Sequence, residues 1–271
     1  MKIRILSDTH VEAYNGEYSE KWHYQHPEFD KIIEKINSHI HHVCEDEILV
    51  LPGDLGIVMD MQKNFNPYYE KLLYYFKSRW NYIIIVPGNT EYHGMPNLES
   101  TVATESVLEK KCKEMDIIYL QKGVVKIDDY FFVGCTLYQY ITNKEWKNLK
   151  ETDKEIFMHP IMYKAWYVDH LEWLHNILNG LEERGDKAIV ITHYPPETKA
   201  KSPRYKVNKE SVTHIDKFVD MHKDTIKLWI CGHVHDKHYM NKRGVPIYVN
   251  SYGEPWEKDA LKPENGLIEI D

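Results

Sequence analysis

Short apolar runs and longer amphipathic stretches alternate along the first half of the chain. Each apolar run is rich in β-branched residues and bounded by turn residues, which predicts a strand, while apolar positions recurring every three or four residues predict helices. The predicted strands are residues 3–7, 48–51, 82–86, 124–127, 131–133, 188–192, 228–231, 247–250 and 267–270. The predicted helices are residues 28–43, 67–79, 98–115, 163–184 and 209–222.

The order of these elements predicts an α/β fold. Strands that alternate with helices are expected to pair in parallel, because a crossover helix returns the chain to the same end of the sheet. From residue 124 on the strands are closer together, and the turn sequences IDDY and NKRG favour hairpins. Both halves fit a two-sheet β-sandwich flanked by helices. Because no internal repeat, low-complexity tract or linker divides the chain, we expect one domain over residues 1–271.

Composition and charge narrow the class of protein. Apolar residues make up 42% of the 271 residues and charged residues 28%, as in soluble globular proteins with a sizeable core. The start MKIRILSDTH has no apolar stretch of signal-peptide length, and no later stretch is long enough to span a membrane. Four scattered cysteines without a Cys-x-x-Cys pair favour reduced thiols. We therefore expect a cytoplasmic protein without a membrane partner, and the net charge of −8 makes extended nucleic acid a less favoured partner.

Five of the predicted strands end in polar residues that can bind a metal. These residues are Asp8, His10, Asp54, Asn89, His193, His233 and His235. A single Asp, Asn or His in such a place is usually a turn residue or a hydrogen-bonded side chain. Several of them at strand ends, where ligands bind in open α/β sheets, indicate one shared site.

The local spacing supports this interpretation. Asp8 and His10 are two residues apart and would project to the same side of an extended chain, as would His233 and His235. Glycine directly precedes Asp54, Asn89 and His233, and glycine tolerates tight turns and close approach of the backbone to a bound group.

The donor set is typical of transition metals. Imidazole nitrogens mixed with carboxylate and carboxamide oxygens suit Mn, Fe, Zn or Ni better than Mg or Ca, which prefer oxygen ligands alone. A pair of divalent ions would organise so many polar groups. A carboxylate that bridges two ions about 3.5–4 Å apart is an arrangement used in phosphoester chemistry.

In its motifs the sequence resembles the calcineurin-like metallophosphoesterases. That family carries D-x-H, G-D, G-N-H-D/E, a His after a strand, and G-H-x-H. This chain has, in the same order, Asp8-Thr-His10, Gly53-Asp54, Gly88-Asn89-Thr90-Glu91, His193 and Gly232-His-Val-His235. The sequences GCTLYQY (134–140) and NSYGEPWE (250–257) resemble its small single-domain bacterial and phage branch of phosphohydrolases. The resemblance implies the family's αββα sandwich.

The resemblance also implies a role for each residue. Asp8, His10 and His235 would bind one metal ion, Asn89, His193 and His233 the other, and Asp54 would bridge the two. The implied reaction is phosphoester hydrolysis, in which two ions such as manganese lower the pKa of a bridging water so that hydroxide attacks phosphorus. The candidate catalytic residues are Asp54, Asn89, Thr90, Glu91 and His193.

Thr90 is a departure from the family pattern, which has His at this position to protonate the leaving group, oriented by the following acid. Threonine cannot donate a proton near neutral pH, and general-acid assistance is worth about 10²–10⁴-fold. We predict an intact metal site with weakened catalysis on esters of poor leaving groups. His93, His23 or His26 could supply the proton instead, or each could be an ordinary surface histidine.

Two segments bear on the substrate. Aromatic residues of 10–29 (Tyr14, Tyr18, Trp22 and Tyr24) could stack on a base or cover the metals, or could equally pack their own loop. Basic residues of 199–209 could bind a second phosphate, or could form a solvated loop. We expect a phosphodiesterase acting on a nucleotide or another small phosphodiester. The alternatives are a nuclease, a phosphomonoesterase, and a catalytically degenerate member that binds metal as a sensor or binding protein.

Overall fold

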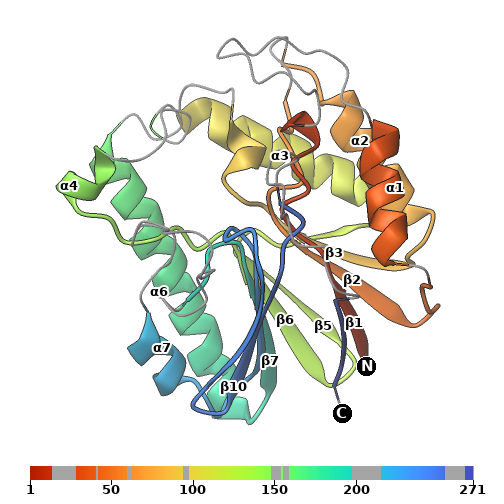
Figure 1. Ribbon diagram of the computed structural model, residues 1–271. Helices are drawn as coiled ribbons and strands as arrows, with labels where there is room; N and C mark the ends of the chain where they lie inside the picture. The colour runs from red at the N-terminus through yellow and green to blue at the C-terminus, as the bar shows by residue number, and fades with distance from the viewer. Residues whose placement is uncertain are drawn as a thin grey trace.

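Two β-sheets pack face to face, with helices on the outer face of each (Figure 1). The computed structural model describes residues 1–13, 29–40, 42–59, 63–93, 98–147, 154, 159–196, 215–253 and 266–270. The first sheet has the order β11-β1-β2-β3-β4, formed by Leu267–Glu269, Lys2–Ile5, Glu47–Pro52, Tyr82–Val86 and Ile118–Tyr119. The second has the order β5-β6-β7-β8-β10-β9, formed by Gly123–Ile127, Tyr130–Cys135, Lys187–Thr192, Ile226–Cys231, Val245–Asn250 and Lys237–Lys242. The predicted two-sheet sandwich flanked by helices is confirmed.

Strand pairing follows the predicted alternation in the first half. Strands β1, β2, β3 and β4 run parallel, and β11 joins β1 antiparallel. In the second sheet the edge strands β5 and β9 form antiparallel hairpins with β6 and β10, at the IDDY and NKRG turns. Its central strands β6, β7, β8 and β10 are parallel, so the hairpin prediction holds only at the edges. Helices between β6 and β7, and between β7 and β8, provide the crossovers that parallel pairing needs.

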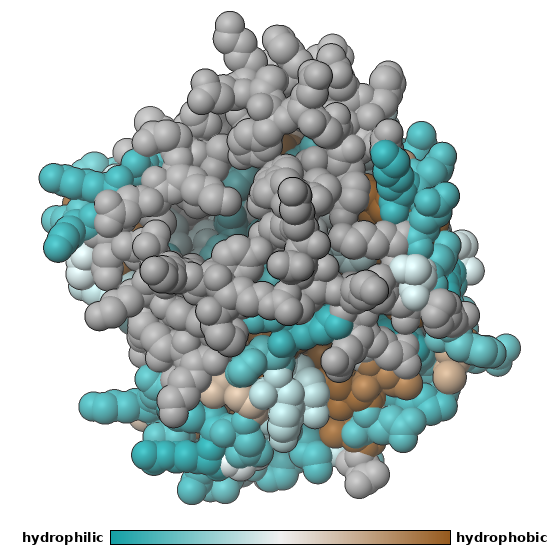
Figure 2. Space-filling view, in the orientation of Figure 1, coloured by the Kyte–Doolittle hydropathy of each residue, from teal (hydrophilic) through white to brown (hydrophobic). Residues whose placement is uncertain are grey.

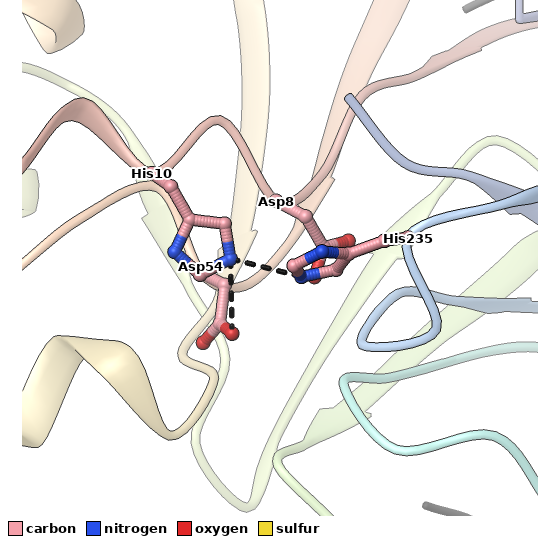
Figure 3. A group of neighbouring side chains, drawn as sticks. All are labelled: Asp8, His10, Asp54 and His235. Atoms are coloured by element: carbon pink, nitrogen blue, oxygen red, sulfur yellow. Dashed lines mark hydrogen bonds and ion pairs between the residues drawn. The ribbon is translucent and has the colours of Figure 1, made fainter. Parts of the chain in front are cut away.

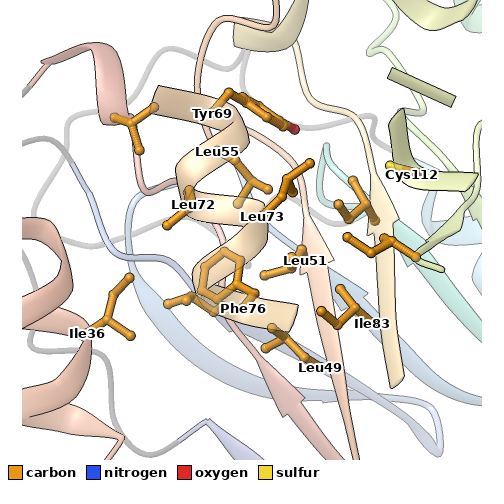
Figure 4. Close-up of a cluster of buried hydrophobic side chains, with 14 of the residues drawn as sticks. Ile36, Leu49, Leu51, Leu55, Tyr69, Leu72, Leu73, Phe76, Ile83 and Cys112 are labelled. Carbon is orange, nitrogen blue, oxygen red and sulfur yellow. The ribbon is translucent and has the colours of Figure 1, made fainter. Parts of the chain in front are cut away.

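Apolar residues occupy both faces of the central strands because both faces are covered. In β2, Ile48 and Val50 point into the core between the two sheets, which they share with residues of β7 and β8. The alternate residues Leu49 and Leu51 point outward against helices of the first layer (Figure 4). Period-two alternation thus assigns each residue of one strand to one of two cores.

In the described part of the chain, three helices cover the first sheet and two cover the second. They are α1 (Phe29–His39), α2 (Pro67–Lys77) and α3 (Leu98–Glu114), and α6 (Pro160–Arg184) and α7 (Asp216–Met221). Helix α2 begins with Pro67 at its first position, and the Asn66 side chain accepts a hydrogen bond from the Tyr68 N–H, so both start signals are local. Its Leu72 and Phe76 pack onto the sheet (Figure 4).

The differences from the predicted elements are small. Strand β1 ends at Ile5, two residues before the predicted end, and α7 begins at Asp216, while residues 209–214 lie outside the described part. Strands β4 and β9 were not predicted. Neither were the short helices η1 (Val11–Ala13), η2 (Thr90–Tyr92) and α4 (Asn143–Trp146). The four cysteines are free thiols, and three of them are buried.

None of the helices in the described part of the chain has the length and apolar character that crossing a membrane needs. One face of the molecule is mainly hydrophilic where it is described, with a smaller hydrophobic area at the lower right (Figure 2).

Candidate metal centre

The carboxyl ends of strands from both sheets meet at one edge of the sandwich. Asp8 and His10 follow β1, Asp54 follows β2, Asn89 follows β3, His193 follows β7, and His233 and His235 follow β8. The structure therefore brings together all the residues that the strand ends indicated. Asp8, His10, Asp54, Asn89 and His193 are buried, while His233 and His235 are half-buried.

The backbone at this edge is left-handed at several non-glycine residues. Asp8, His10, Asp54, His233 and His235 have φ between 44° and 68°. The expectation that Asp8 and His10, or His233 and His235, project together from extended chain is therefore wrong. Their side chains converge because tight turns follow the strands, and strained backbone of this kind gathers at functional sites.

The first group of side chains consists of Asp8, His10, Asp54 and His235 (Figure 3). Each offers one nitrogen or oxygen, and these atoms all lie within 4.8 Å of one another. The Nε2 atoms of His10 and His235 are 3.0 Å apart, and His10 Nε2 is 3.6 Å from Asp54 Oδ2. This group has the size and donor types of a single metal site.

A second group shares Asp54 with the first. Asp54, His193 and His233 again offer atoms within 4.8 Å of one another. His193 Nε2 lies 3.1 Å from His233 Nδ1, 3.1 Å from Asn89 Oδ1 and 3.4 Å from Asp54 Oδ1. Because the Asp54 carboxylate faces both groups, one oxygen is available to each.

The charges in this cluster depend on one another. Burial disfavours the charge of Asp54, yet the imidazoles of His193, His10 and His233 hold the pKa of its carboxyl well below its usual range. Burial also opposes the charge of His193, but Asp54 raises the pKa of this imidazole to about 9. A positive charge therefore stabilises Asp54 in this buried place. The clustered carboxylates, carboxamide and imidazoles fit a pair of divalent cations, which would supply that charge.

Several supporting residues around the cluster are not among those that the sequence predicted. Asp8 accepts hydrogen bonds from the Ser7 and Ser251 hydroxyls, the second at 2.6 Å. The Tyr194 hydroxyl lies 3.3 Å from Asn89 Oδ1, and its ring centroid lies 4.0 Å from that of His233. Ser251 belongs to the NSYGEPWE stretch and Tyr194 directly follows a predicted ligand, but neither position by itself indicates a role.

Glu12 is a further supporting residue. Its Oε1 lies 2.9 Å from His10 Nδ1. The sequence gives one sign of this contact, which is that Glu12 lies two residues after His10. The contact itself depends on the turn of helix η1, which the sequence did not predict.

Glu91 follows a threonine and not the histidine that the acid at this position orients in the family. Its carboxylate accepts hydrogen bonds from the backbone N–H groups of Asp54, Leu55 and Gly88, at 2.9, 2.8 and 2.7 Å. Burial and the Asp54 carboxylate raise the pKa of Glu91 to about 7, while the N–H donors favour its charged form. Glu91 therefore joins the turn after β2 to the turn after β3.

Thr90 and the three candidate proton donors, His93, His23 and His26, are placed as follows. Thr90 is buried, and its backbone N–H donates to Asp54 Oδ1 at 2.8 Å. His93 is 8% exposed, so the alternative that it is an ordinary surface histidine is wrong. His23, His26, the aromatic residues of 14–28 and the basic residues of 199–209 lie outside the described residues.

The fold and the buried Asp/His cluster together define the class of metal-dependent phosphoesterases. The chain matches the calcineurin-like phosphoesterase family over residues 1–237 and belongs to that family. An uncharacterized protein of Acanthamoeba polyphaga mimivirus is 24% identical over 248 residues, which are 82% of this chain and 84% of that protein.

Two solved structures show the same fold at low sequence identity. Phosphopantetheinyl hydrolase of Mycobacterium tuberculosis superposes with a TM-score of 0.69 at 17% identity, covering 99% of this chain and 95% of the other. A dimetal phosphatase of Danio rerio superposes with a TM-score of 0.53 at 13% identity, covering 93% and 87%.

Proposed function

We propose that this metallophosphoesterase is a phosphodiesterase that acts on a nucleotide or another small phosphodiester. The observation that carries the proposal is the pair of donor groups at the sandwich edge, with Asp54 facing both. Such a pair fits the two-ion arrangement that serves phosphoester hydrolysis.

Each group would hold one divalent transition metal ion, Mn, Fe, Zn or Ni. We assign Asp8, His10 and His235 to one ion, Asn89, His193 and His233 to the other, and Asp54 to both. When bound, the ions would supply a nucleophile at neutral pH and would neutralise the phosphoryl oxygens.

The protein's own part is to hold these donors in place and in the right protonation state. His193 Nδ1 lies 2.8 Å from the Pro52 carbonyl oxygen, which can only accept, so Nδ1 carries the hydrogen and Nε2 faces the cluster. The Ser7 and Ser251 hydroxyls orient the Asp8 carboxylate. Residue 90 is threonine, which cannot donate a proton near neutral pH. The leaving group must therefore be protonated by another residue or leave without protonation.

The charges around the cluster favour a diester over a monoester. Glu12 lies behind His10, with its Oε1 2.9 Å from His10 Nδ1, and adds a negative charge beside the cluster. A monoester dianion would bring a second negative charge near Glu12, whereas a diester brings one. This argument supports phosphodiesterase activity ahead of phosphatase activity.

Hydrolysis of two aryl esters tests the proposal. The purified protein is assayed with bis-p-nitrophenyl phosphate and p-nitrophenyl phosphate, with Mn²⁺ and with a chelator. We expect faster turnover of the diester, dependent on metal and lost in Asp54→Asn, which removes one oxygen of the shared carboxylate at nearly constant volume.

A second candidate function follows from Thr90. If the protein binds two equivalents of Mn²⁺ and hydrolyses neither ester, it is a metal-binding protein without catalysis. A positive result leads to a wider panel of nucleotides, cyclic dinucleotides and a phosphopantetheine-bearing protein, the last because one structural relative is a phosphopantetheinyl hydrolase.

A further inference from the structure

His10 has a carboxylate partner on the side of its ring that faces away from the cluster. Its Nδ1 lies 2.9 Å from Glu12 Oε1, while its Nε2 lies 3.0 Å from His235 Nε2 and 3.6 Å from Asp54 Oδ2. A carboxylate oxygen can only accept a hydrogen bond. The hydrogen of a neutral His10 ring therefore belongs on Nδ1, and the lone pair of Nε2 faces the other donors.

The backbone brings Glu12 to this position. His10 N–H donates to the Asp54 carbonyl and Val11 N–H to the Leu55 carbonyl, which fixes the chain on the turn after β2. Helix η1 then turns the Glu12 side chain back toward Nδ1 of the imidazole. Gly56 makes room, because a Cβ there would lie 2.4 Å from Val11 Cγ2 and 3.1 Å from Glu12 Oε2.

The surroundings of the Glu12 carboxylate favour its interaction with His10. Glu12 Oε2 is buried and has no hydrogen-bond partner among the described residues. The Glu12 side chain is 16% exposed, so little water screens it from the ring. The second group has an analogous support, since the Pro52 carbonyl accepts from His193 Nδ1. The supports differ in charge, because one is a carboxylate and the other a neutral carbonyl.

We propose that Glu12 is a positioning residue that keeps His10 in the Nδ1–H tautomer and so presents Nε2 as a ligand of the first metal site. The metal-binding part of this inference rests on the proposed function. A carboxylate behind a ligating histidine typically changes metal affinity by about 10–100-fold. Glu12 would act on one of the two sites, because its described contact is with His10 alone among the proposed ligands.

The tautomer can be measured without metal and without activity. Nitrogen-15 NMR of the histidine-labelled protein, recorded above the pKa of the imidazoles, distinguishes the two tautomers, and His10→Ala identifies the His10 signals. We expect the Nδ1–H form in the wild-type protein and a shift toward the Nε2–H form in Glu12→Ala. Glu12→Gln should largely keep the wild-type pattern, because its amide oxygen still accepts a hydrogen bond.

Calorimetric titration with Mn²⁺ tests the consequence for binding. We expect Glu12→Ala to weaken one of two equivalents by about 10–100-fold, and Glu12→Gln to weaken it less. In a His10→Ala background, Glu12→Ala should have no further effect, because its partner is absent. Glu114→Ala is the control, since it removes one negative charge from the surface of α3.

The two experiments test the role of Glu12 separately from the proposed function. An unchanged tautomer in Glu12→Ala, or a loss of Mn²⁺ affinity that persists in the His10→Ala background, overturns the inference. A wild-type protein that binds no Mn²⁺ overturns the proposed function. In that case the NMR comparison still decides whether Glu12 sets the tautomer.

Discussion

The two residues after Asn89 serve the site through different atoms. Thr90 contributes its backbone N–H to Asp54, so the side chain at this position can change without loss of that hydrogen bond. Glu91 contributes its side chain to backbone N–H groups of two turns. The apolar strand β3 therefore ends in polar residues because the turn after it must be held against the turn after β2.

Replacing Thr90 by histidine should restore a proton donor. We expect Thr90→His to raise kcat on alkyl phosphodiesters by about 10²-fold or more, with little change on aryl diesters, whose leaving groups need no protonation. Metal content, measured by elemental analysis, should stay the same because the backbone bond to Asp54 is kept.

Thr90→Gln is the matched control, since it adds a side chain of similar length that cannot donate a proton by dissociation. An equal gain in Thr90→Gln would mean that size, and not acid catalysis, changed the rate. No gain in Thr90→His at constant metal content would contradict a missing general acid as the cause of slow turnover.

Replacing one carboxyl oxygen of Glu91 should loosen both turns. In Glu91→Gln one oxygen becomes an NH₂ group facing N–H donors, and an unsatisfied buried donor costs about 1–3 kcal/mol. We expect a lower free energy of unfolding in urea, measured in chelator, and weaker Mn²⁺ binding at both sites. Glu70→Gln on α2 is the control, because Glu70 pairs with Lys111 near the surface. Wild-type stability and affinity in Glu91→Gln would show that the N–H contacts contribute little.

The sequence predicts those site residues that directly follow a recognisable strand end. Asp54 and Asn89 each follow a glycine at the end of an apolar run, so pattern alone places them at a strand end. Glu12 and Ser251 have no such mark. Their contacts arise from a left-handed turn and from a strand end far along the chain, and both require the folded backbone.

At the scale of elements, helix α6 is tied to the segment after β6 by one buried histidine. His170 Nδ1 accepts the backbone N–H of Leu137 at 3.1 Å, where Leu137 has a left-handed φ of 53°. Burial lowers the pKa of His170 to about 4. The neutral ring is thus part of how this helix packs on the second sheet.

This histidine should make stability depend on pH. The folded pKa of His170 is about 4, below the value of about 6.5 expected for an unfolded chain, so the unfolded state binds a proton first. Its contribution is fully present above about pH 6.5 and is lost as the pH falls toward 4, at up to about 1.4 kcal/mol per pH unit. Urea unfolding of wild type and His170→Gln at several pH values measures the difference in slope. Parallel curves for the two proteins would contradict this assignment.

The elements that the sequence predicted best are those with a simple burial pattern. Strand β3 is apolar nearly throughout because both of its faces are covered, and its predicted bounds are those observed. Edge strand β9 alternates half-buried and exposed residues and carries charged side chains, so its sequence gives no comparable signal. Its pairing with β10 follows from the NKRG turn and the neighbouring strand.

At the scale of the whole molecule, the candidate centre joins the two sheets. Asp8, Asp54 and Asn89 come from the first sheet, and His193 and His233 from the second. Strand β11 pairs with β1, so the first and last described segments lie side by side (Figure 1). Ions bound at this edge would therefore link parts of the fold that meet only in the native state.

Metal removal should accordingly lower the stability of the entire fold. A ligand that binds only the native state stabilises it by about 2.7 kcal/mol at 100 times its Kd, which corresponds to a rise in Tm of about 5–10 °C for a protein of this size. We expect calorimetry to show one unfolding transition that moves up by this order with Mn²⁺ and returns with chelator. Asp54→Asn should lose most of the shift, while His10→Ala should keep part of it, because the second group of donors remains. An equal shift in wild type and Asp54→Asn would mean that Mn²⁺ acts elsewhere on the protein.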